Sequence, residues 1–133
     1  MPKIEKPKGI SEIEIPGQPY STVVQIGNHF HFSGIVAINE DKKPNGDAEQ
    51  QIIGVFTRML KILNICGLTF NDVYSVFVDL SPWSDEIYTV FNKQWDSIFG
   101  ECEIKPRRKV KGTEGLPFGC AVEIIFDACR QSD

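Results

Sequence analysis

Strand-forming residues occur in short runs in the first two thirds of the chain. Residues 21–26 and 29–37 are two such runs, and the Gly27-Asn28 pair between them is typical of a two-residue hairpin turn. Residues 73–80 form a third run, which ends at Ser81-Pro82. These patterns predict three strands in the first two thirds of the chain.

Two other segments carry apolar residues at helical spacing. In residues 48–66 the apolar stripe comprises Ile52, Val55, Phe56, Met59, Leu60, Ile62 and Leu63. Asp47 is a suitable N-cap for this helix, and Gly67 is a suitable stop. A second helix is predicted to open at Ser84 and to end at Gly100. Its stripe comprises Ile87, Val90, Phe91, Trp95 and Ile98.

The last third of the chain predicts two more strands, 105–111 and 120–127. Alternate side chains of a strand point to opposite faces. Arg108 should therefore lie on the face opposite to the basic stripe, which comprises Lys105, Arg107, Lys109 and Lys111. If the two strands form an antiparallel hairpin, Arg108 and Glu123 lie opposite each other. Such a pair is either a structural ion pair or a site for a small carboxylate and a water.

The predicted order is ββαβαββ. A single mixed sheet with two helices on one face, an α+β fold, is the economical packing. We expect residues 1–10 to form a flexible N-terminal arm and residues 11–130 to form one domain, which is long enough to bury a core.

Composition and charge narrow the possible functions. A formal net charge of −4 argues against a protein that tracks a phosphate backbone, although the basic stripe keeps RNA as an alternative. No stretch is long and apolar enough to predict a membrane span, and the N-terminus lacks the apolar core of a secretory signal. We therefore expect a cytoplasmic protein.

The cysteines and histidines do not form a recognisable metal motif. The four cysteines have no CxxC spacing, and we interpret Cys66 and Cys120 as core residues and all four as reduced thiols. His29 and His31 form an H-x-H pair without a third ligand at a telling distance, so a polar strand face is favoured over zinc. We expect neither a metal nor a cofactor.

Several short motifs occur together in a fixed order along residues 10–128. They are Pro19-Tyr20-Ser21, Phe32-Ser33-Gly34, Asn92, Pro106-x-Arg108, Leu116-Pro117 and Val122-Glu123-Ile124. In this order and spacing they resemble the RidA/YjgF family of enamine/imine deaminases, whose members are also described as endoribonuclease L-PSP or translation inhibitors. Each motif alone is weak, and their combination is specific.

This resemblance implies a chorismate-mutase-like fold that assembles as a homotrimer with clefts between subunits. It also implies cofactor-free hydrolysis of 2-enamine or 2-imine carboxylates, such as 2-aminoacrylate and 2-iminopropionate, to 2-keto acids and ammonia. Arg108 would bind the carboxylate of this small metabolite, and Glu123 would hold the attacking water. By the same resemblance, the remaining substrate-binding residues are Tyr20, Ser33, Gly34, Asn92 and Val110.

The chain departs from the family pattern at three positions. Lys109 stands where serine or threonine is usual, Arg107 replaces a small residue, and Ile35 replaces a polar one. These departures leave the natural substrate open. Two alternatives also stay open, namely an RNA-directed activity that uses the basic stripe and a non-catalytic trimer that binds a small metabolite.

Overall fold

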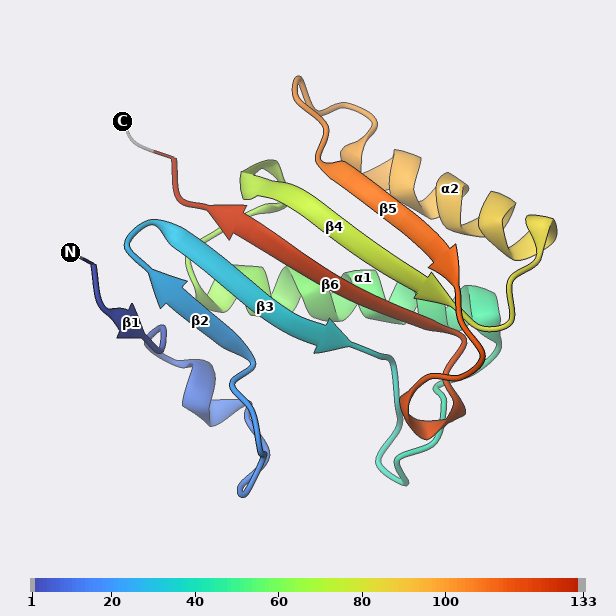
Figure 1. The fold of residues 1–133 in the computed structure, drawn as a ribbon, viewed down its shortest axis with the longest axis horizontal. Coiled ribbons are helices and arrows are strands. Elements are labelled where there is room, and N and C mark those ends of the chain that lie inside the picture. Colours follow the sequence, from blue (N-terminus) through green and yellow to red (C-terminus); the bar gives the residue numbers. More distant parts are fainter. Residues whose placement is uncertain (1, 132–133) are drawn as a thin grey trace.

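The computed structural model describes residues 2–131 as a curved sheet with two helices on one side (Figure 1). Six strands lie in the order β1-β2-β3-β6-β4-β5. They are β1 (Ile4–Glu5), β2 (Val23–Ile26), β3 (His29–Ile35), β4 (Val73–Leu80), β5 (Arg107–Gly112) and β6 (Val122–Cys129). Only β4 and β5 pair in parallel, which makes the sheet mixed.

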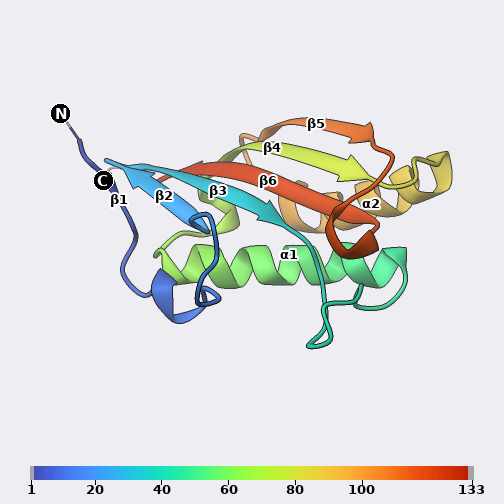
Figure 2. The same ribbon diagram turned by 60° about the horizontal axis from the view of Figure 1, so that its bottom comes forward.

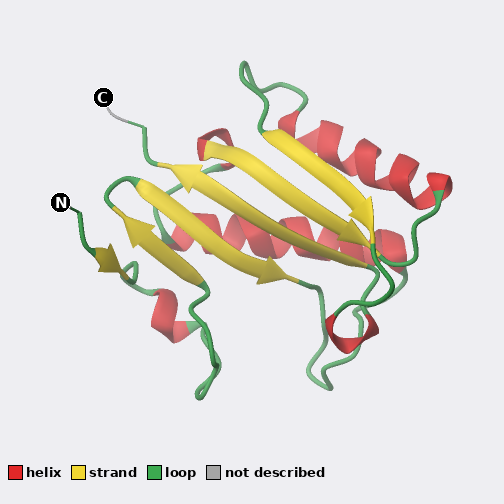
Figure 3. Cartoon of the chain, viewed as in Figure 1, coloured by secondary structure: helices red, strands yellow, loops and turns green. Residues whose placement is uncertain are grey.

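The helices α1 (Ala48–Ile65) and α2 (Asp85–Phe99) both lie beneath the same face of the sheet (Figure 2). The predicted α+β class and the order ββαβαββ are therefore confirmed, with the short β1 as an addition. Three single turns of 3₁₀ helix, Ile10–Glu12, Phe70–Asp72 and Pro117–Gly119, lie in the connections, where Figure 3 shows them in red.

Local sequence signals fix both helix starts. The Asp47 side chain accepts a hydrogen bond from the backbone N–H of Gln50, and the Gln50 side chain accepts one from the backbone N–H of Asp47, each at 2.8 Å. The Ser84 hydroxyl likewise accepts from the Ile87 N–H at 3.1 Å. Gly67, at φ 74°, follows the end of α1 as predicted, because this left-handed conformation suits glycine.

The core lies between the sheet and the helices. Its largest fully buried side chains are Phe30, Phe91, Phe99, Phe126, Ile10, Ile52, Met59, Ile62, Leu63, Leu68, Leu80 and Ile124. Cys66 and Cys120 are buried as predicted. None of the helices within residues 2–131 has both the length and the apolar composition needed to cross a bilayer.

The N-terminal segment differs from the expected flexible arm. Ile4 and Glu5 pair with Ile26 and Gln25 of β2, and Ile10 is fully buried. The free edge of β2 offers backbone partners, and the core offers an apolar site for Ile10. These contacts hold the segment against the domain.

The far face of the sheet, which we call the open face, has no helix over it (Figure 2). Tyr74, Phe77 and Ile125 are 40%, 43% and 45% exposed. Phe77 and Ile125 are paired residues of β4 and β6. An apolar strip therefore lies uncovered on this side of the subunit.

Candidate functional site

The structure brings Glu123 and Gly34 into close contact. Glu123 is the second residue of β6, and its half-buried carboxyl group lies against Gly34 near the end of β3. A Cβ added to Gly34 would lie 2.9 Å from both Cδ and Oε2 of Glu123. Only a residue without a side chain leaves room for the carboxyl group in this position. Two residues that the sequence analysis singled out therefore form one unit.

The segment that contains Tyr20 is tied to the same end of β3. The Ser33 hydroxyl donates to the Ser21 carbonyl at 2.6 Å, and the Ser33 N–H donates to the Thr22 carbonyl at 2.9 Å. The Tyr20 side chain is 58% exposed. Tyr20, Ser33 and Gly34 thus belong to one neighbourhood with Glu123.

Burial raises the pKa of Glu123, and the negative charge of Asp79 raises it further. Asp79 of β4 is the direct cross-strand partner of Glu123. The predicted position of Arg108 opposite Glu123 was wrong, because the cross-strand neighbour of Glu123 is an acid. The sequence reasoning missed Asp79. Asp79 is the one acid in the strand 73–80, and this was the signal that could have revealed it.

Arg108 lies elsewhere, and the predicted hairpin between the last two strands was wrong. Arg108 pairs with Val76 of β4, whereas β6 pairs with the other side of β4. β4 therefore separates β5 from β6. The link over residues 113–121 is long enough to pass the end of β4, where Thr113 N–H donates to the Leu80 carbonyl at 3.0 Å.

The Arg108 side chain points to the helix side of the sheet. Its guanidinium carbon lies 4.9 Å from the ring centroid of Trp95 and 5.8 Å from that of Tyr88. Its Nη2 donates to the Tyr88 hydroxyl at 3.2 Å. Its Nη1 is buried and has no hydrogen-bond partner among residues 2–131. Glu123 is on the open face, so the two groups point to opposite sides of the sheet.

Asn92 and Val110 lie on the same side as Arg108. Asn92 follows Tyr88 by one helical turn on α2, and its Oδ1 is buried without a hydrogen-bond partner in the described part of the chain. Val110, two residues after Arg108, packs against the core. Tyr88 was not predicted, although its spacing of four from Asn92 places both on one helix face.

The predicted alternation of the basic stripe is confirmed. Arg107, Lys109 and Lys111 are exposed, whereas Arg108 is half-buried on the other face. Arg107 Nε donates to the Ser75 hydroxyl at 3.2 Å, and Lys111 Nζ lies 2.8 Å from Asp79 Oδ1. Two of these cations are therefore engaged within the subunit.

The histidine pair lies on the open face of β3. His31 Nδ1 is 2.7 Å from Asp127 Oδ1, and the two imidazole rings stack with centroids 6.5 Å apart. Within residues 2–131, no cluster of three or more His, Cys, Asp or Glu side chains is arranged to hold a metal ion.

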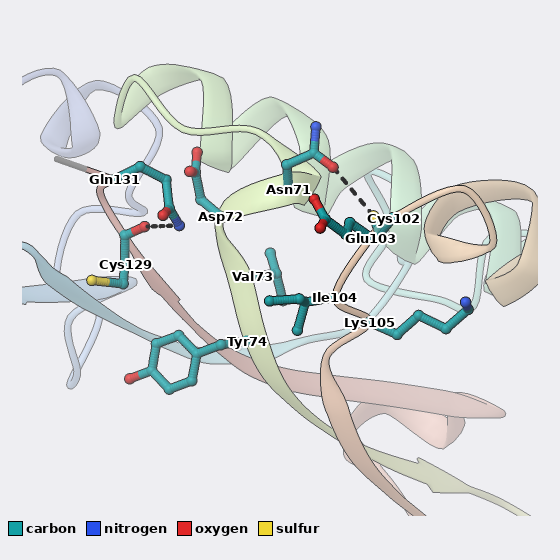
Figure 4. A pocket seen from close by; sticks show the side chains of 10 residues that line it. All are labelled: Asn71, Asp72, Val73, Tyr74, Cys102, Glu103, Ile104, Lys105, Cys129 and Gln131. Atoms are coloured by element: carbon teal, nitrogen blue, oxygen red, sulfur yellow. Dashed lines mark hydrogen bonds between the residues drawn. The ribbon is translucent and has the colours of Figure 1, made fainter. Parts of the chain in front are cut away.

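A cavity of about 480 Å³ opens at the other end of the sheet, between the start of β4, the end of β6 and the loop before β5 (Figure 4). The Cys102 thiol donates to Asn71 Oδ1 at 3.2 Å on one side of it, and Tyr74 and Cys129 lie on the other. Its lining is Asn71, Asp72, Val73, Tyr74, Cys102, Glu103, Ile104, Lys105, Cys129 and Gln131. None of the predicted site residues is among them.

Comparison with known proteins agrees with the fold described above. The family model described as endoribonuclease L-PSP matches residues 11–129. This chain belongs to the RidA/YjgF family. A RutC family protein of Pyrococcus horikoshii is 30% identical over 118 residues, which cover 87% of this chain and 90% of that protein.

Two further relatives of this RidA/YjgF family member are informative. A 2-iminobutanoate/2-iminopropanoate deaminase of Dermatophagoides farinae is 28% identical over 113 residues, with 82% of this chain and 84% of that protein covered. The crystal structure of RidA from the Antarctic bacterium Psychrobacter sp. superposes with a TM-score of 0.76 at 26% identity, covering 87% of this chain and 92% of that one.

Proposed function

We propose that this protein hydrolyses small 2-enamine or 2-imine carboxylates to 2-keto acids and ammonia. Family membership and the deaminase of Dermatophagoides farinae support the reaction class. The observation that carries the proposal is the half-buried Glu123 carboxyl group, seated against Gly34 on a face without helices. This arrangement holds a proton acceptor beside a backbone that a substrate can approach closely.

The reaction needs little besides orientation. Glu123 directs a water onto the carbon of the C=N bond and accepts its proton as the bond's electron pair moves to nitrogen. The resulting carbinolamine breaks its C–N bond and releases ammonia and the keto acid. The backbone N–H groups of Gly34 and Val110 and the hydroxyl of Tyr20 assist binding, together with Ser33 and Asn92.

Arg108 binds the substrate carboxylate. A guanidinium fork matches a carboxylate with two parallel hydrogen bonds. The buried Nη1 of Arg108 has no partner among the described residues, which is costly, and an incoming carboxylate removes that cost. The same carboxylate displaces the Tyr88 hydroxyl from Nη2.

Arg108 and Glu123 lie on opposite faces of one sheet, so a shared cleft requires two copies of the chain. We expect a homotrimer in which Arg108 of one subunit meets Glu123 of its neighbour. The exposed apolar strip of Tyr74, Phe77 and Ile125 supports such an assembly, since a surface of this kind favours contact with another protein surface.

The test begins with imine turnover. A serine dehydratase supplies 2-aminoacrylate, and keto-acid release is followed with the unchanged protein, with Arg108→Ala and with Glu123→Gln. Each variant should lose most of the acceleration, whereas Arg58→Ala, an exposed arginine on α1, should retain it. No acceleration by the unchanged protein would refute the proposal, and ligand binding without turnover would favour a metabolite-binding trimer.

Mixing the two inactive variants tests the location of the site. In a trimer reassembled from equal amounts of Arg108→Ala and Glu123→Gln, about a quarter of the clefts contain both intact residues if each cleft is shared. Activity should return to roughly that fraction. A site built within one subunit would stay inactive in every mixture.

The RNA-directed alternative relies on the cations of β5, two of which already have partners in the subunit. RNA cleavage that falls steeply with salt and disappears in Lys109→Ser, without imine turnover, would favour it. We also place the protein in the cytoplasm, where its four free thiols would stay reduced.

A further inference from the structure

Three charged side chains form a row across the open face, beside the end of β3. Asp79 of β4 lies between Lys111 of β5 and Glu123 of β6, and the strand register pairs it with both. Lys111 Nζ lies 2.8 Å from Asp79 Oδ1. The side chain of Lys111 is 58% exposed and that of Asp79 is 30% exposed, and Glu123 is half-buried like Asp79.

Two carboxyl groups on directly opposite residues of antiparallel strands stand close, with Cβ atoms about 5 Å apart. At this separation in a half-buried place, two negative charges repel, and one group holds its proton more tightly. Lys111 lies next to Asp79, on the side away from Glu123, and forms an ion pair with the Asp79 carboxylate. The cation therefore stands on the far side of Asp79 from Glu123, and Glu123 is the group that gains proton affinity.

The other surroundings of Glu123 do not offset this effect. At the end of β3 it lies against Gly34, which carries no charge. On β5, Lys109 is exposed and lies two residues from Lys111. Before β6, the buried thiol of Cys120 has its own pKa raised by burial and by Glu123. The remaining acid of β6, Asp127, is four residues away and bonds to His31.

We propose that Asp79, held by Lys111, is a positioning residue that makes Glu123 a proton carrier rather than only an anchor for water. This inference rests on the proposed imine hydrolysis and assigns Asp79 and Lys111 a role in it. A fully ionised glutamate of ordinary acidity accepts a proton poorly, whereas catalysis is most efficient when the pKa of the acid–base group lies near the working pH.

The proton then makes one round trip. As the water oxygen bonds to the carbon of the protonated imine (C=NH₂⁺), one water proton passes to the Glu123 carboxylate, and the C=N electron pair moves to nitrogen, which becomes the NH₂ group of the carbinolamine. Glu123 next gives that proton to the amine nitrogen of the carbinolamine. The C–N bond breaks, ammonia leaves with the bonding electrons, and the hydroxyl proton is released as the C=O bond forms. Glu123 ends the cycle ionised, as it began.

Titration of Glu123 by carbon NMR, on protein with ¹³C-labelled glutamate, tests the coupling without any substrate. The Glu123→Gln variant assigns the signal. In Asp79→Asn, Glu123 should titrate at lower pH than in the unchanged protein. In Lys111→Met, where Asp79 loses its cation, it should titrate at higher pH. Asp127→Asn is the matched control, because about four residues of strand place it more than a Debye length away.

Imine turnover over the same pH range gives the second measurement. The acid limb of the kcat/KM profile should move in Asp79→Asn and Lys111→Met by the amounts that the titration moves. An unchanged titration in Asp79→Asn refutes the coupling. A shifted titration that the rate does not follow refutes the proton-carrying role alone. Absence of turnover in the unchanged protein refutes the proposed function, and the role of Glu123 as a carrier with it.

Discussion

Replacing Gly34 with alanine tests whether the Glu123 carboxyl group must keep its position against β3. The new Cβ would lie 2.9 Å from Cδ and Oε2 of Glu123, whereas ordinary contacts are 3.4–4 Å. The backbone at Gly34 does not need a positive φ, so the substitution introduces no conformational strain. The carboxyl group ends a flexible side chain and can move away.

The expected result is a loss of activity with little loss of stability. Relieving the contact moves the carboxyl group by about 1 Å, and a misplacement of that size costs on the order of 10²-fold in rate. We therefore expect kcat/KM for imine hydrolysis to fall by roughly 10²-fold. The midpoint of thermal unfolding should stay close to that of the unchanged protein.

Keto-acid release measures the rate, and a thermal melt measures the stability. Gly115→Ala is the matched control, since a Cβ at Gly115 meets nothing within 4 Å and should leave both quantities unchanged. Full activity in Gly34→Ala would show that turnover does not depend on the position of the Glu123 carboxyl group against Gly34. A large drop in thermal midpoint would show instead that Gly34 has a structural role.

Three further predictions address other groups. Glu123→Gln should stabilise the fold at neutral pH. The pKa of Glu123 is raised in the folded state, so its contribution to stability is present below the unfolded-state pKa and is lost as pH rises through the folded-state pKa. Urea unfolding should therefore show a higher free energy of unfolding for the variant at pH 8 and no difference at pH 4. Gln51→Leu should cost about 1–3 kcal/mol by urea unfolding. Gln51 is buried, and its loss leaves the Ala121 N–H and the Gly46 carbonyl unpaired; an unchanged midpoint would mean that water replaces both bonds. Tyr88→Phe should lower KM by roughly tenfold, because the Arg108 Nη2 then has no hydroxyl to give up; a higher KM would mean that the hydroxyl helps to bind substrate.

The elements that the sequence predicted well are those that local chemistry controls. Asp47, Ser84 and Gly67 act on neighbouring backbone groups, so their roles can be read from a few residues. The face of Arg108 was also predictable, because strand alternation is a local property.

The partner of each strand is not a local property, and there the prediction was wrong. Counting residues across a supposed hairpin assumed that consecutive strands pair, whereas β6 inserts between β3 and β4. A strand, a helix of 15 residues and another strand, as in β4, α2 and β5, favour a parallel pair. That pattern was present in the sequence and favours β4 rather than β6 as the partner of β5.

The two edge strands of the sheet, β1 and β5, have features that disfavour aggregation. β1 has only two residues, and β5 carries exposed lysines at positions 109 and 111. A short edge strand and a charged edge strand both disfavour the addition of a strand from another protein. The added strand would form few backbone hydrogen bonds with β1, and at β5 it would have to bury lysine ammonium groups. Lys109 and Lys111 of the basic stripe therefore also disfavour aggregation through this edge of the sheet.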